Sequence, residues 1–183
     1  MKYFKWILIL LALFFFVLLP QKMYLFHSKK EWSSNERETL LKAAVTALTT
    51  RDIPISSILV YKKKIIGTGY NTVVKDTNIG GHAEINAISN AMKNIEDSSL
   101  KYLDKDSLYL ITTFEPCLMC KGAIIEQGIH HVYFVKEKEA THWFKNNAKL
   151  LRYEWLKTQT KENTLQDSIF QLHPDYKKRA QQQ

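Results

Sequence analysis

The only two cysteines of this chain stand three positions apart, in the segment Pro116-Cys117-Leu118-Met119-Cys120. Cysteines at positions i and i+3 lie on one face of a helical turn, so their sulfurs can reach a common point. We expect that helix to start at Pro116, because the missing N–H of proline has no partner to lose at the first helical position. A helix N-terminus also favours thiolate over thiol, through its unpaired N–H groups and its dipole. Cys117 and Cys120 are therefore candidate ligands of a metal ion.

The segment His82-Ala83-Glu84 supplies what two thiolates lack for a catalytic zinc site. Such a site has three protein ligands and one position open to water. The neutral imidazole of His82, at the start of another predicted helix, is the candidate third ligand of Zn²⁺. Glu84 is the candidate proton shuttle rather than a ligand. It would take a proton from the water, protonate a ring nitrogen of the substrate and later deliver a proton to the departing amine.

Each of these residues also has an ordinary structural interpretation. Cys117 and Cys120 could be two small, buried hydrophobic side chains. A purely structural zinc site is a second alternative, but it needs a fourth protein ligand, and the chain has no third cysteine to supply one. Glu84 could be a first-turn acid that complements the helix dipole, an interaction worth less than about 1 kcal/mol.

The composition is that of a globular protein, with 45% apolar and 24% charged residues. It excludes wholesale disorder, collagen-like repeats and a many-span membrane protein, and two cysteines are too few for a disulfide-stapled scaffold. A net charge of +8 would suggest a nucleic-acid partner. However, five of the 26 basic residues precede the first acidic residue, Glu31, which leaves 21 basic against 18 acidic residues in the rest of the chain. The basicity belongs mostly to the N-terminus.

The N-terminal segment contains an unbroken apolar run from Trp6 to Leu19. Counting from Tyr3 to Phe26 brings it to the length of a bilayer-spanning helix, about 20 residues. We expect residues 1–30 to form a hydrophobic helix that anchors the protein in a membrane. A cleaved signal peptide is the alternative, although no A-x-A-like cleavage site follows the run. Lysines flank the run on both sides, so the positive-inside rule leaves the orientation open.

Hydrophobic periodicity and turn residues predict helices that alternate with strands along the rest of the chain. Ser33 and Glu36 form a capping-box pattern before the first of these helices, whose expected apolar face includes Leu40, Leu41, Val45 and Leu48. The predicted helices cover 33–50, 82–95, 116–127 and a region around 144–155, and the predicted strands cover 55–61, 65–70, 107–113, 129–135 and a short segment at 165–172. The alternation is typical of an α/β layered domain with a central sheet. The short Lys62–Lys64 turn makes the first pair of strands antiparallel, while the later helical crossovers favour parallel neighbours.

The pattern H-x-E followed by P-C-x-x-C resembles the signature of the zinc-dependent deaminases. Thr112 to Ala123 (TTFEPCLMCKGA) and Gly81 to Ala87 (GHAEINA) are similar to the bacterial tRNA adenosine deaminases of the cytidine-deaminase-like superfamily, and the order of elements agrees from Glu36 to Val135. The resemblance implies a three-layer α/β/α sandwich with a central mixed five-stranded sheet, preceded here by the N-terminal hydrophobic helix. It also implies a homodimer and makes Asn71, at the end of the second strand, the candidate substrate-binding residue. The chain departs from that family after the fourth strand, where it lacks a Gly-Ala-x-Asp segment.

These observations predict a zinc-dependent deaminase domain over residues 31–183, with a frayed tail at 170–183. The expected reaction removes the exocyclic amine of a nucleobase, in an aminopurine such as the adenosine of tRNA. Deamination of free guanine or of cytosine bases, nucleosides or nucleotides is the alternative reaction, and a metal-stabilised binding domain at the membrane is the non-enzymatic one. The expected partners are the nucleobase-containing substrate and the membrane. The expected location is a membrane with the catalytic domain on the cytosolic side, where tRNA and nucleotides are found.

Overall fold

The structure, a computed structural model, describes residues 6–7, 31–95, 99–139, 141–158, 168–169 and 171–172. The chain divides into two units, residues 1–137 and 138–183. The elements of the first unit are α2 (Ser34–Thr49), β1 (Ser56–Tyr61), β2 (Lys64–Tyr70), α3 (Ala83–Lys93), β3 (Leu108–Phe114), α4 (Leu118–Glu126) and β4 (His131–Lys136), with short 3-10 turns at Leu100–Tyr102 and Lys105–Ser107. The second unit contains α5 (Thr141–Leu156).

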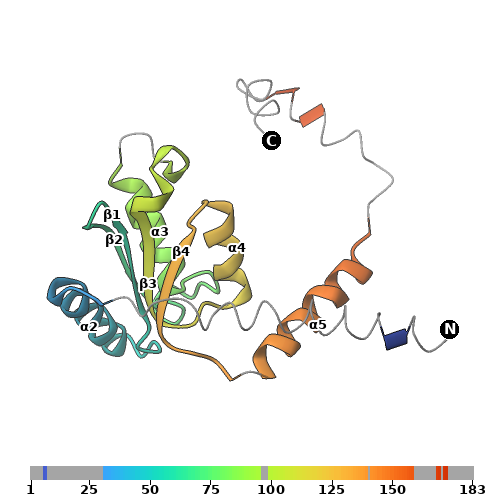
Figure 1. Ribbon diagram of the computed structural model, residues 1–183, viewed down its shortest axis with the longest axis horizontal. Helices are drawn as coiled ribbons and strands as arrows, with labels where there is room; N and C mark the ends of the chain where they lie inside the picture. The colour runs from blue at the N-terminus through green and yellow to red at the C-terminus, as the bar shows by residue number, and fades with distance from the viewer. Residues whose placement is uncertain are drawn as a thin grey trace. The chain divides into compact units, whose positions relative to one another are not determined.

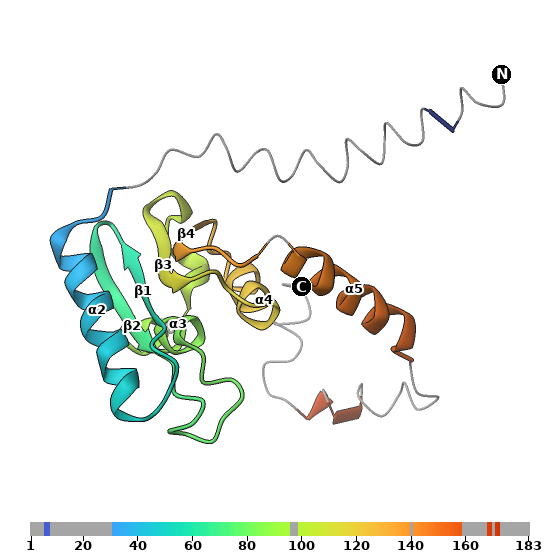
Figure 2. The ribbon, with the colours of Figure 1, turned by 90° about the horizontal axis from the view of Figure 1, so that it is seen from below.

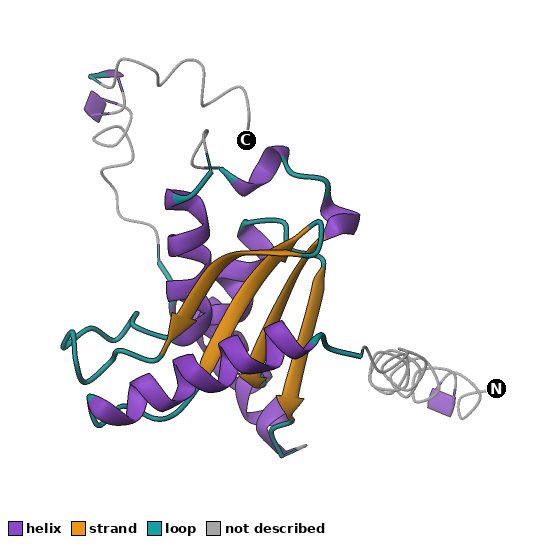
Figure 3. Cartoon of the chain, turned by 90° about the vertical axis from the view of Figure 1, so that its left-hand side faces the viewer, coloured by secondary structure: helices purple, strands orange, loops and turns teal. Residues whose placement is uncertain are grey.

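The four strands form one mixed sheet in the order β2-β1-β3-β4 (Figure 1). As predicted, β1 and β2 form an antiparallel hairpin, and β3 and β4, joined through α4, are parallel. The remaining pair, β1 with β3, is antiparallel. Helix α2 covers one face of the sheet, and α3 and α4 cover the other (Figures 1 and 2). Figure 3 shows the strands behind α2.

Side chains of the two central strands alternate between the two helix layers, which is why these strands are almost continuously apolar. Leu59 and Leu110 belong to a buried cluster with Ile88 of α3 and Ile124 of α4. Their neighbours along the strands, Ile58, Val60 and Ile111, belong to a second cluster with Leu40 of α2. The core therefore lies on both faces of the sheet and holds the helices that carry the site in fixed positions.

Helix α2 begins at the predicted cap but buries a different face from the expected one. Ser33 and Glu36 form the complete capping box, with Ser33 N–H donating to the Glu36 carboxylate at 2.7 Å. The buried positions are Glu36, Leu40, Ala43 and Ala47, whereas Leu41, Val45 and Leu48 are more than half exposed. The face that packs on the sheet is thus built mainly from small side chains, and the prediction for this face was correct only for Leu40.

The backbone of helix α3 lies directly against the backbone of β2 because β2 carries two glycines. A Cβ atom added at Gly69 would lie 2.3 Å from the carbonyl oxygen of Ala83 and from the amide nitrogen of Ala87. One at Gly67 would lie 2.2 Å from the carbonyl oxygen of Ala87. No side chain fits at these distances. The two glycines therefore bring the N-terminal half of α3, and with it the predicted site, onto the sheet.

We expect Gly69→Ala to destabilise the protein by about 3 kcal/mol, since the added methyl group meets rigid backbone that cannot yield as a flexible side chain would. Urea unfolding followed by circular dichroism measures this difference. Gly122→Ala is the matched control, because no atom lies within 4 Å of a Cβ atom at that position of α4. This substitution should raise the free energy of unfolding by about 0.5–1 kcal/mol, since alanine is the better helix former. Equal effects of the two substitutions would contradict the close approach of α3 to β2.

Two predictions about the architecture are corrected. The sheet has four strands in the part of the chain that the structure describes, not five. The chain forms α5 after β4, and the residues described in the predicted strand at 165–172 are in helix or turn conformation instead. The predicted membrane anchor falls on residues 1–30, of which only Trp6 and Ile7 are described. No helix among the described residues has the length and apolarity to cross a membrane, so the predicted transmembrane helix and membrane location are withdrawn.

Candidate metal centre

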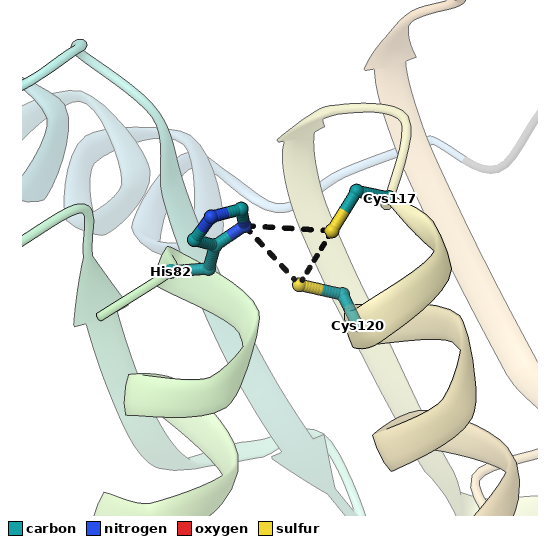
Figure 4. A group of neighbouring side chains, drawn as sticks. All are labelled: His82, Cys117 and Cys120. Carbon is teal, nitrogen blue, oxygen red and sulfur yellow. Dashed lines mark hydrogen bonds between the residues drawn. The ribbon is translucent and has the colours of Figure 1, made fainter. Parts of the chain in front are cut away.

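The three predicted ligands lie at the starts of two neighbouring helices (Figure 4). His82 is the N-cap residue of α3, and Cys117 is the N-cap residue of α4, both with extended backbone. Cys120 lies in the first turn of α4 and is fully buried. The prediction that α4 starts at Pro116 was two residues early, because the helix begins at Leu118. As an N-cap residue, Cys117 lies beside the unpaired N–H groups of the first turn instead of supplying one of them.

The side chains of His82, Cys117 and Cys120 converge on one point. His82 Nδ1 lies 3.5 Å from Cys117 Sγ and 3.6 Å from Cys120 Sγ, and the two sulfurs are 3.6 Å apart. With Zn–S bonds of about 2.3 Å and a Zn–N bond of about 2.0 Å, tetrahedral ligands are separated by about 3.5–3.8 Å. The triangle therefore fits three of the four corners of a zinc site. These three residues also form the one group of potential metal ligands found among the described residues.

The two cysteines form an unequal pair. The hydrogen bond from Cys120 lowers the pKa of the Cys117 thiol to about 4 against the effect of burial, and the backbone amides of Cys120 and Met119 act in the same direction. The contact with Cys117, together with burial, raises the pKa of the Cys120 thiol. A thiolate is the form of cysteine that binds a metal ion, so the lowered pKa of Cys117 suits it to be a ligand.

Glu84 follows His82 by two residues on α3, and its side chain is only 4% exposed. Its Oε2 lies 3.5 Å from Cys120 Sγ, so the carboxylate lies beside the three candidate ligands. Burial raises the pKa of the Glu84 carboxyl above its ordinary value, opposed by hydrogen bonds from its own backbone N–H and from Cys120. A buried carboxyl with a raised pKa is suited to exchange protons near neutral pH.

The structure places Asn71 just after the end of β2, where its backbone N–H donates to the carbonyl of Ile55. Asn71 is 7% exposed. The next residue, Thr72, donates its N–H to the carbonyl of Gly81 at 2.7 Å. The strand end with Asn71 is therefore fixed directly beside His82.

Two further residues of this region were missed by the sequence analysis. Asp52, in the connection between α2 and β1, accepts from the N–H groups of Val74 (2.7 Å) and Lys75 (3.2 Å). Asn86, on α3, donates its side-chain amide to the segment around Asn71. Neither has a local sequence signature, since their partners lie 22 and 16 positions away.

The carboxylate of Asp52 holds the loop after Asn71 through hydrogen bonds whose contribution to stability depends on pH. Burial alone would raise the pKa of the Asp52 carboxyl, but the hydrogen bonds from Val74, Thr50 and Lys75 outweigh it and hold the pKa below its ordinary value. A carboxyl with a lowered pKa in the folded state stabilises the protein above the pKa of the unfolded chain, about 3.9. The stabilisation is lost as the pH falls through the folded-state pKa.

We therefore expect Asp52→Asn to lower the free energy of unfolding at pH 7, and the difference from the unsubstituted protein to shrink below about pH 4. Urea titrations at several pH values measure it. Asp76→Asn is the control, because Asp76 is an exposed acid in the same loop. A difference that stays constant down to pH 3 would show that Asp52 is neutral or unpaired in solution.

Several curated proteins are similar to this chain in sequence. The tRNA-specific adenosine deaminase of Buchnera aphidicola (subspecies Schizaphis graminum) is 42% identical over 94 residues, which are 51% of this chain and 59% of the relative. That of Haemophilus influenzae is 34% identical over 107 residues, which are 58% of this chain and 59% of the relative. The chain spans about half the length of most curated relatives that it matches.

Solved structures agree with the fold. A structure from a study of A-to-I editing by tRNA:A34 deaminases matches with a TM-score of 0.51 and 27% identity, over 57% of this chain and 77% of that one. Guanine deaminase from Bacillus subtilis matches with a TM-score of 0.56 and 21% identity, over 76% of this chain and 95% of that one. The second likeness shows a shared fold and nothing about substrate.

The family match covers the four strands and the helices α2, α3 and α4. Residues 30–136 match the cytidine and deoxycytidylate deaminase zinc-binding region. The match includes the His82, Cys117 and Cys120 cluster, and the two findings together confirm the predicted Zn²⁺ cofactor. They also agree with the predicted class, a zinc-dependent deaminase, since the matched region is the zinc-binding region of deaminases. The chain belongs to the cytidine and deoxycytidylate deaminase zinc-binding family.

Proposed function

We propose that this chain is a zinc-dependent deaminase that converts the exocyclic amine of an adenine in tRNA into a carbonyl group. The observation that carries the proposal is the triangle of His82, Cys117 and Cys120 with the buried carboxylate of Glu84 beside it. A purely structural zinc site would need a fourth protein ligand, and no other His, Cys, Asp or Glu among the described residues joins the group. The fourth corner is therefore assigned to solvent.

The proposed roles of the residues follow from their positions. His82, Cys117 and Cys120 would hold the metal, and a zinc ion held there would supply Lewis-acid chemistry that lowers the pKa of water towards about 7. Glu84 accepts a proton from water as the water oxygen bonds to the ring carbon that carries the amine, and passes this proton to the adjacent ring nitrogen. Glu84 then takes the remaining hydroxyl proton to the amine. The carbon–nitrogen bond breaks, and the products are ammonia and a carbonyl at the ring carbon, with no change in oxidation state.

Asn71 is proposed to bind the nucleoside. The side-chain amide of Asn71 offers both a hydrogen-bond donor and an acceptor, which suits it to bind a nucleoside. The N–H of the next residue, Thr72, donates to the carbonyl of Gly81, which precedes His82. A base bound by Asn71 would therefore lie close to the metal ligands. The adenine of tRNA is favoured as substrate because the curated relatives cited above are named tRNA-specific adenosine deaminases.

The test of this function is an assay of the full-length, zinc-loaded protein on a panel of substrates. Ammonia release and inosine formation are measured on tRNA anticodon stem-loops, adenosine, guanine, cytosine and cytidine. We expect inosine in the stem-loops and little product from the free compounds. Activity confined to free guanine or to cytosine compounds would overturn the tRNA assignment and keep the deaminase. The homodimer implied by the resemblance stays a prediction, and sedimentation of the same preparation checks it.

A further inference from the structure

We propose that Asn86 is a positioning residue of this site: its side-chain amide ties the strand end that carries Asn71 to the segment that carries His82. In this way Asn86 sets where the nucleobase lies relative to the metal. The proposal rests on the proposed deaminase function and on the role of Asn71 in it. Asn86 itself contacts neither a metal ligand side chain nor, in this scheme, the reacting atoms.

The Asn86 amide donates to both residues that flank Asn71. Its Nδ2 lies 2.8 Å from the carbonyl oxygen of Tyr70 and 3.0 Å from the hydroxyl oxygen of Thr72. A third, longer contact of 3.4 Å joins Nδ2 to the carbonyl oxygen of Gly81. One NH₂ group therefore binds the chain immediately before Asn71, immediately after Asn71 and immediately before His82.

Backbone hydrogen bonds near Asn86 connect the same two segments, the strand end with Asn71 and the start of α3 with His82. The Asn86 N–H donates to the carbonyl of His82 at 2.9 Å, as the first helical bond of α3. Thr72 N–H donates to Gly81 at 2.7 Å. A Cβ atom at Gly81 would lie 2.8 Å from the Thr72 hydroxyl, so only glycine lets the two segments meet at this distance. Asn86 thus bridges the candidate base-binding residue and the candidate metal ligand.

This bridge matters for catalysis because the two groups it connects come from separate elements. Asn71 follows β2, and His82 caps α3, with a loop of ten residues between them. A misplacement of about 1 Å between a bound substrate and its catalytic groups can lower the rate about 100-fold. Without the Asn86 amide, the carbonyl of Tyr70 and the hydroxyl of Thr72 lose their side-chain donor. Asn71 between them is then held less firmly, by the backbone bonds of Asn71 to Ile55 and of Thr72 to Gly81.

The same helix supplies a matched control. Asn90 and Asn94 follow Asn86 at intervals of four residues, and their Nδ2 atoms donate to the carbonyls of Thr68 (2.9 Å) and Ile66 (3.1 Å). The three asparagines bind alternate carbonyls along the edge of β2, so each makes the same kind of helix-to-strand bond. Only Asn86 makes it next to Asn71 and His82. A purely structural role would therefore be shared by Asn86 and Asn90.

The experiment compares Asn86→Ala with Asn90→Ala in the full-length, zinc-loaded protein, by zinc content, thermal unfolding and kinetics on the best substrate of the panel. We expect both variants to bind one zinc ion, and Asn86→Ala to lose at least as much thermal stability as Asn90→Ala, since the Asn86 amide makes more hydrogen bonds. We expect kcat/KM to fall about 10- to 100-fold in Asn86→Ala and less than about twofold in Asn90→Ala. The pair Asn86→Asp and Asn90→Asp, which keeps the side-chain shape but removes the donor, gives the same comparison if an alanine variant does not fold.

A double-mutant cycle tests whether Asn86 acts through Asn71. In an Asn71→Ala background, Asn86→Ala should lower kcat/KM by less than about threefold further, since the residue that it positions is gone. Full additivity, or equal losses in the Asn86 and Asn90 variants, would overturn the positioning role and leave the deaminase function standing. Absence of activity in the unsubstituted protein on every substrate overturns the function itself, and the positioning role with it.

Hydrogen exchange adds a readout that does not depend on turnover. The Thr72 N–H, bonded to Gly81, should exchange faster in Asn86→Ala than in Asn90→Ala, because only the first substitution releases Thr72. Unchanged exchange of Thr72 in Asn86→Ala would overturn the proposed bridge.

Discussion

Replacing Glu84 by glutamine should lower kcat by about 1,000-fold or more while the protein still binds one zinc ion. Glutamine has nearly the same shape as glutamate, so the side chain can remain beside Cys120 and the metal ligands are not disturbed. It cannot accept a proton, however, and positioned general acid–base groups contribute about 10²- to 10⁴-fold to a rate. Glu84 is proposed to serve in more than one proton transfer, which places the expected loss in the upper part of that range.

Ammonia release under single-turnover conditions and metal analysis of the same sample measure the effect. Glu126→Gln is the control, because Glu126 is an exposed acid at the end of α4. It changes the net charge equally and should leave kcat within about twofold. If Glu84→Gln kept the unsubstituted rate with zinc bound, Glu84 would have no part in proton transfer. A protein that binds zinc and turns over no substrate, with or without Glu84, would instead be the non-enzymatic binding domain.

The candidate metal ligands could be proposed from the sequence because the patterns that mark them are local. Cys117 and Cys120 are three positions apart at the start of one helix, so their spacing alone predicts that the two sulfurs lie on one face. His82 and Glu84 are close together at the start of another helix. What spacing could not give is the distance between the two turns. That distance depends on the packing of α3 against β2, and therefore on Gly67 and Gly69. The resemblance to zinc deaminases supplied this link, and the geometry of the triangle agrees with it.

The buried face of α2 shows why hydrophobicity alone is an incomplete guide. Two stripes overlap on this helix: Leu41, Val45 and Leu48 on one, and Leu40, Ala43 and Ala47 on the other. Counting large apolar side chains favours the first stripe. The helix buries the second, because small residues let it approach the sheet closely and because Glu36 on that stripe is paired with Ser33 and the Tyr109 hydroxyl. Long-range partners thus decided between two stripes of similar periodicity.

Asn86 was missed for the same physical reason. Asparagines at positions 86, 90 and 94 form a polar stripe on α3, and a polar stripe on a helix normally faces solvent. Here the stripe faces the open edge of β2, whose outward carbonyls need donors. The number of strands in the sheet likewise depends on the whole fold and could not be predicted from local sequence patterns. It was inferred from the resemblance, and the described residues form a sheet of four strands that ends with β4, the point after which the sequence departs from the family pattern.

Loss of one metal ligand should have the second large effect: His82→Ala should lower the affinity for zinc at least about 100-fold and reduce ammonia release to background. The two remaining sulfurs, 3.6 Å apart, supply only two of the three protein ligands of a catalytic zinc site. The variant should nevertheless fold, since neither hydrophobic cluster of the core includes His82, Cys117 or Cys120. Circular dichroism, metal analysis and the deaminase assay on one sample separate these effects.

Thermal unfolding measures how much a bound zinc ion stabilises the folded protein. A ligand present at 1,000 times its dissociation constant stabilises the folded state by about 4 kcal/mol, which is roughly 10 °C in the melting temperature of a domain of this size. We therefore expect a chelator to lower the melting temperature of the unsubstituted protein by about that amount, and added Zn²⁺ to restore both stability and activity. His82→Ala should unfold at the lower temperature with or without zinc. His130→Ala, which removes an exposed histidine far along the chain, should behave as the unsubstituted protein does. If His82→Ala kept stoichiometric zinc and its zinc-dependent stability, His82 would not be a metal ligand. The metal would then be bound at another site, and the proposed mechanism would be wrong.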